Sequence, residues 1–256
     1  MQLIIQRKVL ATLAVVAASV LLATVGAGVA WALNVDCTID TAALCEGTNN
    51  ADELEGEDVS DGDQGRRDVI KGKGGSDGAE GNGGNDKILG GNGRDAINNS
   101  LDGGDGNDYV NGENKADGLI QGGDGDDTVL GGPGIDEDVN GDGGDDTVLG
   151  GPGDDEDVEG DDGDDTVNGG PGNDGGSGPG DGELEGGSGN NKVHGGDGDD
   201  RIDANDSDPG DVEDIFGDAD ADTIEAVDGE VDIIDCGPGN DTVNSDAGID
   251  VVAGNC

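Results

Sequence analysis

The chain has almost no aromatic side chains. Its 256 residues include one Trp, one Tyr and one Phe, and there is a single His. Aromatic rings provide much of the apolar area of an ordinary core, so this composition excludes a thick globular core. One His also excludes the H-E-x-x-H metalloprotease motif and, with no Cys-x-x-Cys pair, argues against a zinc site.

Basic residues are also scarce. There are 11 Lys and Arg against 62 Asp and Glu, which gives a formal net charge of -51. Nucleic acid is excluded as a partner because its phosphates are bound by Lys and Arg, and an anionic membrane surface is disfavoured for the same reason. Repulsion between so many carboxylates opposes a compact state. A cation must therefore bind if the chain is to fold.

A long apolar run occurs only at the N-terminus. Arg7 and Lys8 precede it, it extends from Val9 to Ala30, and residues 30–32 form the small-x-small site that signal peptidase reads. Residues 1–32 are therefore predicted to be a secretory signal peptide. The alternative is a retained membrane anchor, because the run is long enough to cross a bilayer. Under either interpretation the remainder is exported, and it is expected to be secreted and extracellular or anchored at the cell surface.

Glycine is abundant, with 56 residues, and it recurs at a fixed period. Four segments fit the pattern G-G-x-G-x-D-x-U-x, in which U is apolar: residues 90–98, 103–111, 122–130 and 195–203. Weaker copies keep the same frame in much of residues 72–244. A repeat of this length indicates a solenoid, in which each unit stacks on its neighbours.

These units resemble the RTX or haemolysin-type calcium-binding repeats. The resemblance implies an all-β fold, a parallel β-roll (β-solenoid) in which two nonapeptides form one coil and calcium lies between neighbouring Gly/Asp turns. Gram-negative members usually lack an N-terminal signal and carry a toxin, protease or lipase domain. This chain has the signal and no room for such a domain, so it looks more like the free-standing repeat proteins that Gram-positive bacteria export. We expect an N-terminal cap with degenerate repeats at residues 33–71 and the calcium-binding roll at residues 72–256.

The residue types in each unit suit calcium. Glycine at positions 1, 2 and 4 permits positive φ and exposes carbonyl oxygens on a tight turn. Calcium takes six to eight oxygen ligands, and the Asp at position 6 adds a carboxylate to the carbonyls. The predicted metal ligands are the position-6 residues Asp77, Asp86, Asp95, Asp108, Asp117, Asp127, Asp146, Asp165, Asp200, Asp222 and Asp241.

Position 8 of each unit is expected to face inward, because the middle side chain of a three-residue strand points away from its two neighbours. Positions 7 and 9, such as Tyr109 and His194, then face outward. The predicted apolar ladder consists of Ile88, Ile97, Val110, Leu119, Val129, Val148, Val167, Val193, Ile202, Ile224 and Val243. Burial of one such side chain and the sheet hydrogen bonds together contribute less free energy than the entropy of ordering nine residues costs. Bound calcium must supply the remainder.

Two units in the middle of the array have ten residues. Residues 131–140 and 150–159 each follow a nine-residue unit, so the local period is 19. An extra residue is expected to form a bulge, and the two bulges should stack on one edge of the roll. The alternative is a tandem duplication without a role. The acids of the two bulges are Glu137, Asp138, Glu156 and Asp157.

The four cysteines lie in the exported part, which is consistent with an oxidising compartment. Cys236 and Cys256 are expected on the same face of successive coils, where the strand spacing of about 4.8 Å suits a disulfide. We predict that they form a C-terminal disulfide and that Cys37 bonds to Cys45, although four cysteines allow three pairings.

An enzymatic role is not expected. A catalytic carboxylate needs a pocket that shifts its pKa, and a roll of small residues offers no such cleft. His194 lacks an activated serine, since Ser177 and Ser188 lie in Gly turns. The sequence predicts a secreted, non-enzymatic calcium-binding protein that folds on binding Ca²⁺. The alternative is a cell-surface adhesive or coat protein in which the calcium-stabilised roll is a spacer that presents loops to an unknown protein or surface partner.

Overall fold

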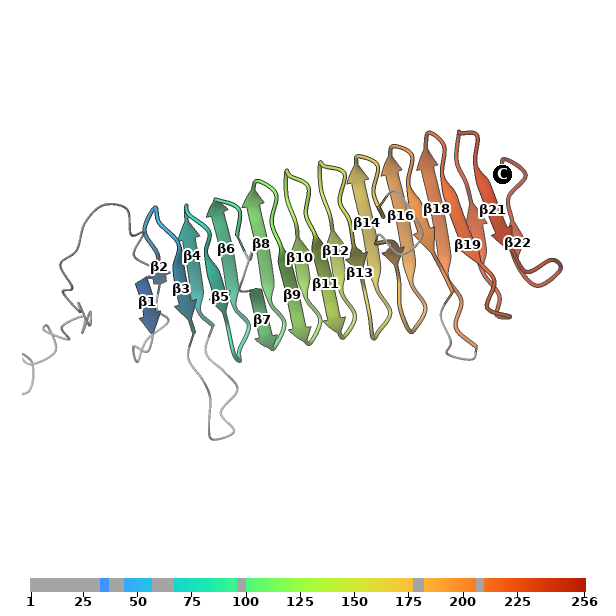
Figure 1. Cartoon of the computed structure of the whole chain (residues 1–256). Coiled ribbons are helices and arrows are strands. Elements are labelled where there is room, and N and C mark those ends of the chain that lie inside the picture. Colours follow the sequence, from blue (N-terminus) through green and yellow to red (C-terminus); the bar gives the residue numbers. More distant parts are fainter. Residues whose placement is uncertain (1–32, 37–43, 57–66, 96–99, 177–181, 206–209) are drawn as a thin grey trace, which may run out of the picture.

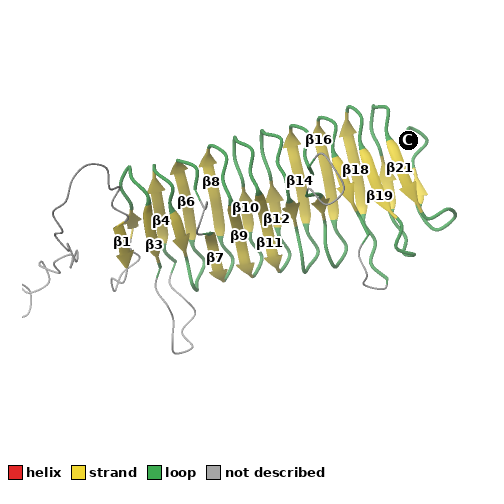
Figure 2. Ribbon diagram, in the orientation of Figure 1, coloured by secondary structure: helices red, strands yellow, loops and turns green. Residues whose placement is uncertain are grey.

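The chain winds into an elongated roll of two parallel β-sheets (Figure 1). Each sheet has eleven strands, and the chain alternates strictly between them, so that sheet A holds the odd-numbered strands and sheet B the even-numbered ones. No helix occurs in the described residues (Figure 2), and therefore none that could cross a membrane. The prediction of an all-β parallel β-roll is confirmed. The computed structural model describes residues 33–36, 44–56, 67–95, 100–176, 182–205 and 210–256.

The strands are two to six residues long. Sheet A contains β1 (Leu33–Asp36), β3 (Asp52–Glu55), β5 (Gly78–Glu80), β7 (Leu101–Asp105), β9 (Leu119–Asp124), β11 (Asp138–Gly143), β13 (Val158–Glu159), β15 (Leu184–Glu185), β17 (Arg201–Asp203), β19 (Thr223–Ala226) and β21 (Thr242–Ser245). Sheet B contains β2 (Leu44–Glu46), β4 (Val69–Lys73), β6 (Lys87–Asn92), β8 (Tyr109–Asn114), β10 (Thr128–Leu130), β12 (Thr147–Leu149), β14 (Thr166–Pro171), β16 (Lys192–Asp197), β18 (Asp214–Ala219), β20 (Ile233–Asp235) and β22 (Val251–Val252).

The register stacks equivalent residues of successive coils. In sheet B, Val129 pairs with Val110 on one side and with Val148 on the other. Parallel pairing in this register repeats along both sheets, so each position of the unit forms a row along the roll. A β-branched residue fits the crowded inner row well.

One row of apolar side chains from each sheet forms the core. The predicted ladder is confirmed at eight fully buried positions: Ile88, Val110, Val129, Val148, Val167, Val193, Ile202 and Ile224. Val243 packs against the core but is only partly buried, and Ile97 lies outside the described residues. The prediction for Leu119 is wrong, because Ile120 is the buried residue of this strand. Its unit carries an extra residue, Gly118, between the turn and the strand.

Variation in unit length is confined to the neighbourhood of sheet A. From β2 to β20, each inward residue of sheet B is followed seven positions later by an aspartate, as Val129 is by Asp136. The number of positions between an aspartate and the inward residue of the next strand differs between the sheets. Before sheet B it is two, as from Asp127 to Val129. Before sheet A it varies, and from Asp136 to Val139 it is three. The longer insertions also adjoin sheet A strands in the sequence. They contain residues 37–43, 57–66, 96–99, 177–181 and 206–209.

The first described strands belong to the same two sheets. β1 pairs with β3, and β2 pairs with β4, both in parallel. A capping role for residues 33–71 remains a prediction. The proposed signal peptide, residues 1–32, lies outside the described residues.

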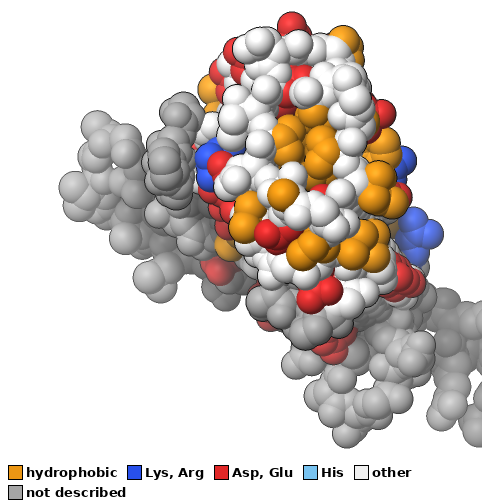
Figure 3. Space-filling model, turned by 90° about the vertical axis from the view of Figure 1, so that its right-hand side faces the viewer, with side chains coloured by type: hydrophobic (Ala, Val, Ile, Leu, Met, Phe, Trp, Pro, Cys, Tyr) orange, Lys and Arg blue, Asp and Glu red, His pale blue; other side chains and the backbone are white. Residues whose placement is uncertain are grey.

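Apolar side chains are exposed at the C-terminal end of the roll (Figure 3). Val252, at an inward position of the last strand, is 40% exposed, whereas Val129 in the middle of the roll is fully buried. A disulfide joins Cys236 and Cys256, whose Cα atoms are 5.2 Å apart, as predicted. Cys45 is also disulfide-bonded, and its predicted partner Cys37 lies outside the described residues.

Replacing both Cys236 and Cys256 with Ser should loosen the last coil and leave the central coils unchanged. The disulfide closes a separation of 20 residues, for which about 3 kcal/mol is expected, and contacts in a solenoid are made only with neighbouring coils. Hydrogen exchange should accelerate in β20 to β22 and stay constant in β10 to β14. Uniform acceleration along the chain would contradict this local role.

Candidate functional site

Two rows of residues, all acidic except Asn191, follow the edges of the roll, each in the turn before a strand. The row that precedes sheet A strands, called row A, contains Asp52, Asp77, Asp95, Asp117, Asp136, Asp155, Asp174, Asp200, Asp222 and Asp241. The row that precedes sheet B strands, called row B, contains Asp68, Asp86, Asp108, Asp127, Asp146, Asp165, Asn191, Glu213, Asp232 and Asp250. The rows are buried except in the last coil, where Asp241 and Asp250 are partly exposed.

From the second member of each row onward, one carboxylate oxygen of each aspartate ties two coils together. The backbone N–H of Asp108 donates to Oδ1 of Asp127 at 2.6 Å, and the N–H of Asp127 donates to Oδ1 of Asp146 at 2.6 Å. The same bond recurs along row A, for example from Asp136 to Asp155 at 2.9 Å. These bonds fix the stacking of the turns, just as the ladder bonds fix the strands.

In fourteen of these aspartates the second carboxylate oxygen is buried without a hydrogen-bond partner. Such an orphaned acceptor is costly unless another group compensates it. The property is shared by the Oδ2 atoms of Asp77, Asp86, Asp95, Asp108, Asp117, Asp127, Asp136, Asp146, Asp155, Asp165, Asp174, Asp200, Asp222 and Asp241. Its repetition in coil after coil indicates a common ligand that carries positive charge.

In all of these turns except that of Asp241, where Cys236 replaces the glycine, the orphaned carboxylate oxygen and a carbonyl oxygen of the next coil both lie close to a glycine. A Cβ atom at Gly122 would be 2.6 Å from Oδ2 of Asp127 and 2.6 Å from the carbonyl oxygen of Gly141 in the next coil. The equivalent Cβ at Gly141 would be 2.5 Å from Oδ2 of Asp146. Only glycine leaves this space open. Carboxylate and carbonyl oxygens therefore converge there, and all-oxygen coordination is what calcium prefers.

Side chains alone do not complete a metal site. In the described part of the chain, no group of three or more His, Cys, Asp or Glu side chains is arranged to hold a metal ion. Coordination would therefore depend on backbone carbonyls together with one or two carboxylates from the rows. This division suits the Gly-rich turns, in which the carbonyls are not hindered by side chains.

Burial raises the pKa of many aspartates in the rows. It raises the pKa of Asp117 and Asp127 to about 7 and that of Asp136 to about 8. The backbone N–H bond from the neighbouring coil lowers each pKa in part, and adjacent carboxylates raise it again. A free aspartate titrates near pH 3.9. Without a cation, a proton is therefore the simplest compensation for the orphaned oxygens.

All eleven aspartates that the sequence singled out lie in the two rows. The rows also contain members that the nonapeptide pattern did not find, of which Asp136, Asp155 and Asp174 are fully buried. In the ten-residue units an extra residue separates the aspartate from the inward valine. These units therefore do not fit the nonapeptide pattern. The constant spacing of seven residues after the sheet B valines was the signal that would have found them.

The acids at position 5 were not singled out by the sequence, and they bond in the opposite direction. The N–H of Asp145 donates to Oδ1 of Asp126 at 3.3 Å, and the N–H of Asp164 donates to Oδ1 of Asp145 at 3.1 Å. On the other edge, the N–H of Asn173 donates to Oδ1 of Asp154 at 3.0 Å. These side chains are exposed, so these turns are held by an inner and an outer carboxylate.

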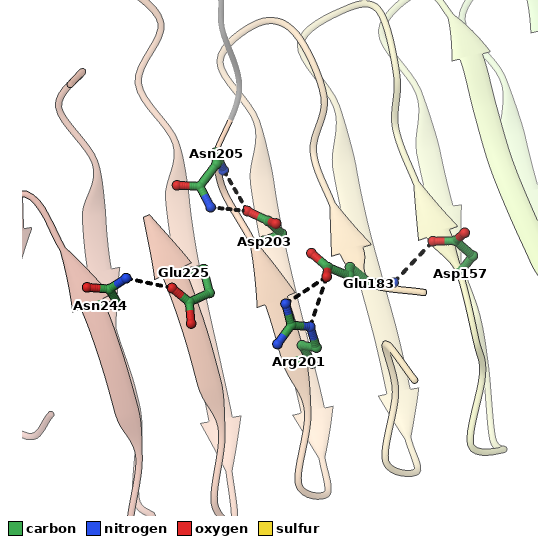
Figure 4. Close-up of polar contacts among 7 residues, drawn as sticks. All are labelled: Asp157, Glu183, Arg201, Asp203, Asn205, Glu225 and Asn244. Carbon is green, nitrogen blue, oxygen red and sulfur yellow. Dashed lines mark hydrogen bonds and ion pairs between the residues drawn. The ribbon is translucent and has the colours of Figure 1, made fainter. Parts of the chain in front are cut away.

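The outer face of sheet A carries a separate set of polar contacts (Figure 4). Arg201 donates two hydrogen bonds to Oε1 of Glu183, at 2.7 and 2.9 Å. Asn244 donates to Glu225 at 2.7 Å in the later coils. These bonds join neighbouring strands from outside and are distinct from the buried rows.

The fold and the rows together define a class of protein: a parallel β-roll whose Gly/Asp turns present oxygen ligands between coils. The family model of the RTX calcium-binding nonapeptide repeat matches more than half of the chain. The matched residues are 64–97, 98–119, 117–138, 140–175, 177–208 and 216–252. The chain belongs to this family of calcium-binding repeats. No curated protein and no solved structure matches it.

Replacing Gly122 with Ala should destabilise its coil, whereas replacing Gly143 with Ala should not. The new Cβ of G122A would collide with Asp127 Oδ2 and the Gly141 carbonyl, while at Gly143 the nearest atom is 3.8 Å away. Thermal unfolding of the two variants in saturating calcium should separate them by several degrees. Equal melting temperatures would contradict the close approach of these two oxygens to Gly122.

The cation-free chain should gain structure as the pH falls from about 8 to about 5. The pKa of Asp127 is about 7 in the roll and near 3.9 in an unfolded chain. The roll therefore binds protons more tightly, so acid stabilises it and this stabilisation is lost as the pH rises through 7. Circular dichroism in chelator should show the β-sheet signal growing with acid. A coil spectrum throughout would contradict the raised pKa values.

Proposed function

We propose that this chain is an exported, non-enzymatic protein that folds on binding Ca²⁺ between its stacked Gly/Asp turns. The observation that carries the proposal is the orphaned carboxylate oxygen of each row, which lies beside a carbonyl of the next coil. Asp127 and its equivalents in rows A and B are the proposed side-chain ligands. Carbonyls such as that of Gly141 would complete the coordination.

Calcium supplies positive charge where the chain has least of its own. The net charge is -51, and the core is one residue wide in each sheet. A divalent ion held between two turns would neutralise neighbouring carboxylates and compensate oxygens that otherwise need protons. An ion that binds only the folded turns stabilises them by mass action. Stacking of coils and binding of calcium are therefore expected to be one cooperative process.

Export fits the same chemistry. The apolar N-terminal run has the features of a signal peptide, and the disulfide between Cys236 and Cys256 requires an oxidising compartment. Extracellular calcium modules bind at roughly 10⁻⁴ to 10⁻³ M, far above cytosolic levels. The chain would then cross the membrane unfolded and wind up outside, where calcium is available.

A second candidate role is that of an adhesive or coat protein at the cell surface. The observation that favours it is the position of the insertions, each of which adjoins a sheet A strand in the sequence. Calcium would then stiffen a spacer that presents these insertions to a partner. Recovery of the protein with an intact N-terminus in the membrane fraction would support this role, and recovery from the medium would support the first.

Calcium should convert an expanded chain into a compact rod. Circular dichroism and small-angle scattering of residues 33–256 should show a coil in chelator at pH 8 and a β-sheet rod in millimolar Ca²⁺. The transition should be steep, because each ion orders two neighbouring turns. A compact rod in chelator at this pH would refute calcium-driven folding.

Replacing Asp127 with Asn provides the local counterpart of this experiment. It should remove one ligand, lower the number of bound ions, and accelerate hydrogen exchange only in β8 to β12. Asp203→Asn is the matched control, because this side chain lies on the outer face of sheet A, outside both rows (Figure 4). Loss of the whole roll in D127N would contradict the near-neighbour description.

A further inference from the structure

The only Phe and the only His of the chain form a stacked pair on the outer face of sheet B. Phe216 in β18 pairs in register with His194 in β16, and their ring centroids are 4.5 Å apart at an interplanar angle of 10°. Lys192, in the same strand as His194, lies with Nζ 5.1 Å from the Phe216 centroid. Both contacts come from the β16 side. On the other side, Phe216 is in register with Asp235 of β20.

A hollow of about 540 Å³ lies beside this ring and crosses four coils. It exists because two adjoining rows consist mainly of small residues: Gly170 pairs with Gly196, and the next row continues from Pro171. Pro171 and Pro238 stand toward its two ends along the roll, and Phe216 contributes its large apolar surface. Phe216 is the one aromatic ring of this open hollow, and the other lining residues are Gly, Ala, Pro and Asp.

Three carboxylates line the hollow, those of Asp197, Asp218 and Asp235. Asp218 is held by His194, whose Nδ1 is 2.7 Å from its Oδ2, but its side chain is still 43% exposed. Asp235 accepts hydrogen bonds from the N–H of Gly237 at 3.1 Å and from Asn255 at 2.6 Å. These bonds lower the pKa of Asp235 and keep it ionised. The hollow therefore carries fixed negative charge next to an aromatic ring.

The chemistry of the lining selects the ligand. Anions are repelled, and a neutral apolar group would leave ionised carboxylates without compensation. A bare metal ion gains nothing from the phenyl face. A guanidinium group satisfies both features, because it is flat, stacks on aromatic faces, and donates paired hydrogen bonds to carboxylates. We propose that this hollow binds an arginine side chain of a partner polypeptide, with Phe216 as the stacking surface and Asp218 and Asp235 as acceptors.

The proposal requires only that the coils around β14 to β20 are folded, so it does not depend on which ion folds them. The lone His and Phe also make it directly testable, since their ring protons give unique NMR signals. Acetyl-arginine-amide added to the protein at saturating Ca²⁺ should shift the His194 and Phe216 signals in a saturable manner. The neutral isostere acetyl-citrulline-amide should not.

Two variants test the assigned residues. Asp235→Asn keeps an oxygen for the N–H of Gly237 but removes the charge, and it should weaken arginine binding about fivefold. Phe216→Leu should abolish the saturable shift of His194. Asp203→Asn, on the outer face of sheet A, is the matched control for lost charge and should bind as the parent does.

Four results would overturn the assignment. The first is an equal response to arginine and citrulline, and the second is unchanged binding in both the Asp235 and the Phe216 variant. The third is a response that disappears as calcium rises to saturation, because it would identify these carboxylates as calcium ligands. A folded roll with no arginine response would also refute the proposal, while leaving calcium-driven folding intact.

Discussion

The roll depends on one carboxylate that serves two neighbours. In each turn, Oδ1 of the position-6 aspartate accepts the backbone N–H of the preceding coil, while Oδ2 stays buried beside a carbonyl of the following coil. The first bond aligns the turns, and the second oxygen demands positive charge. The same carboxylate therefore both aligns the turns and creates the need for a positive charge. A coil that stacks correctly buries an uncompensated oxygen, and under the proposed function calcium would both compensate this oxygen and stabilise the stacking.

The thin core explains why this chain has no alternative source of stability. Each strand contributes one inward side chain, such as Val129 or Ile202, and the described rings of Tyr109 and Phe216 lie outside the core. Ordinary domains of this length bury large apolar side chains in several layers. Here the sheets meet across two rows of Val, Ile and Leu. The missing stabilisation must come from the edges of the roll, where the carboxylate rows lie.

Much of this arrangement could be predicted from the sequence, because a strict repeat makes local chemistry and global fold agree. The pattern identified the inward position and eleven members of the rows. It failed where an extra residue entered a unit: Leu119 was chosen in place of Ile120, and Asp136 was overlooked among neighbouring acids. The stacking of His194 on Phe216 was beyond reach, since it requires the register of two coils separated by an insertion of irregular length.

Because the insertions adjoin sheet A strands in the sequence, they indicate where such a chain can change over evolution. The passage from sheet B to the next aspartate has the same length in every coil, so a deletion or addition there would shift all later coils out of step. Segments beside sheet A carry no such constraint. New loops can be acquired there one at a time, and a foreign peptide placed between Asp174 and Leu184 would leave the spacing from each sheet B strand to the next aspartate unchanged.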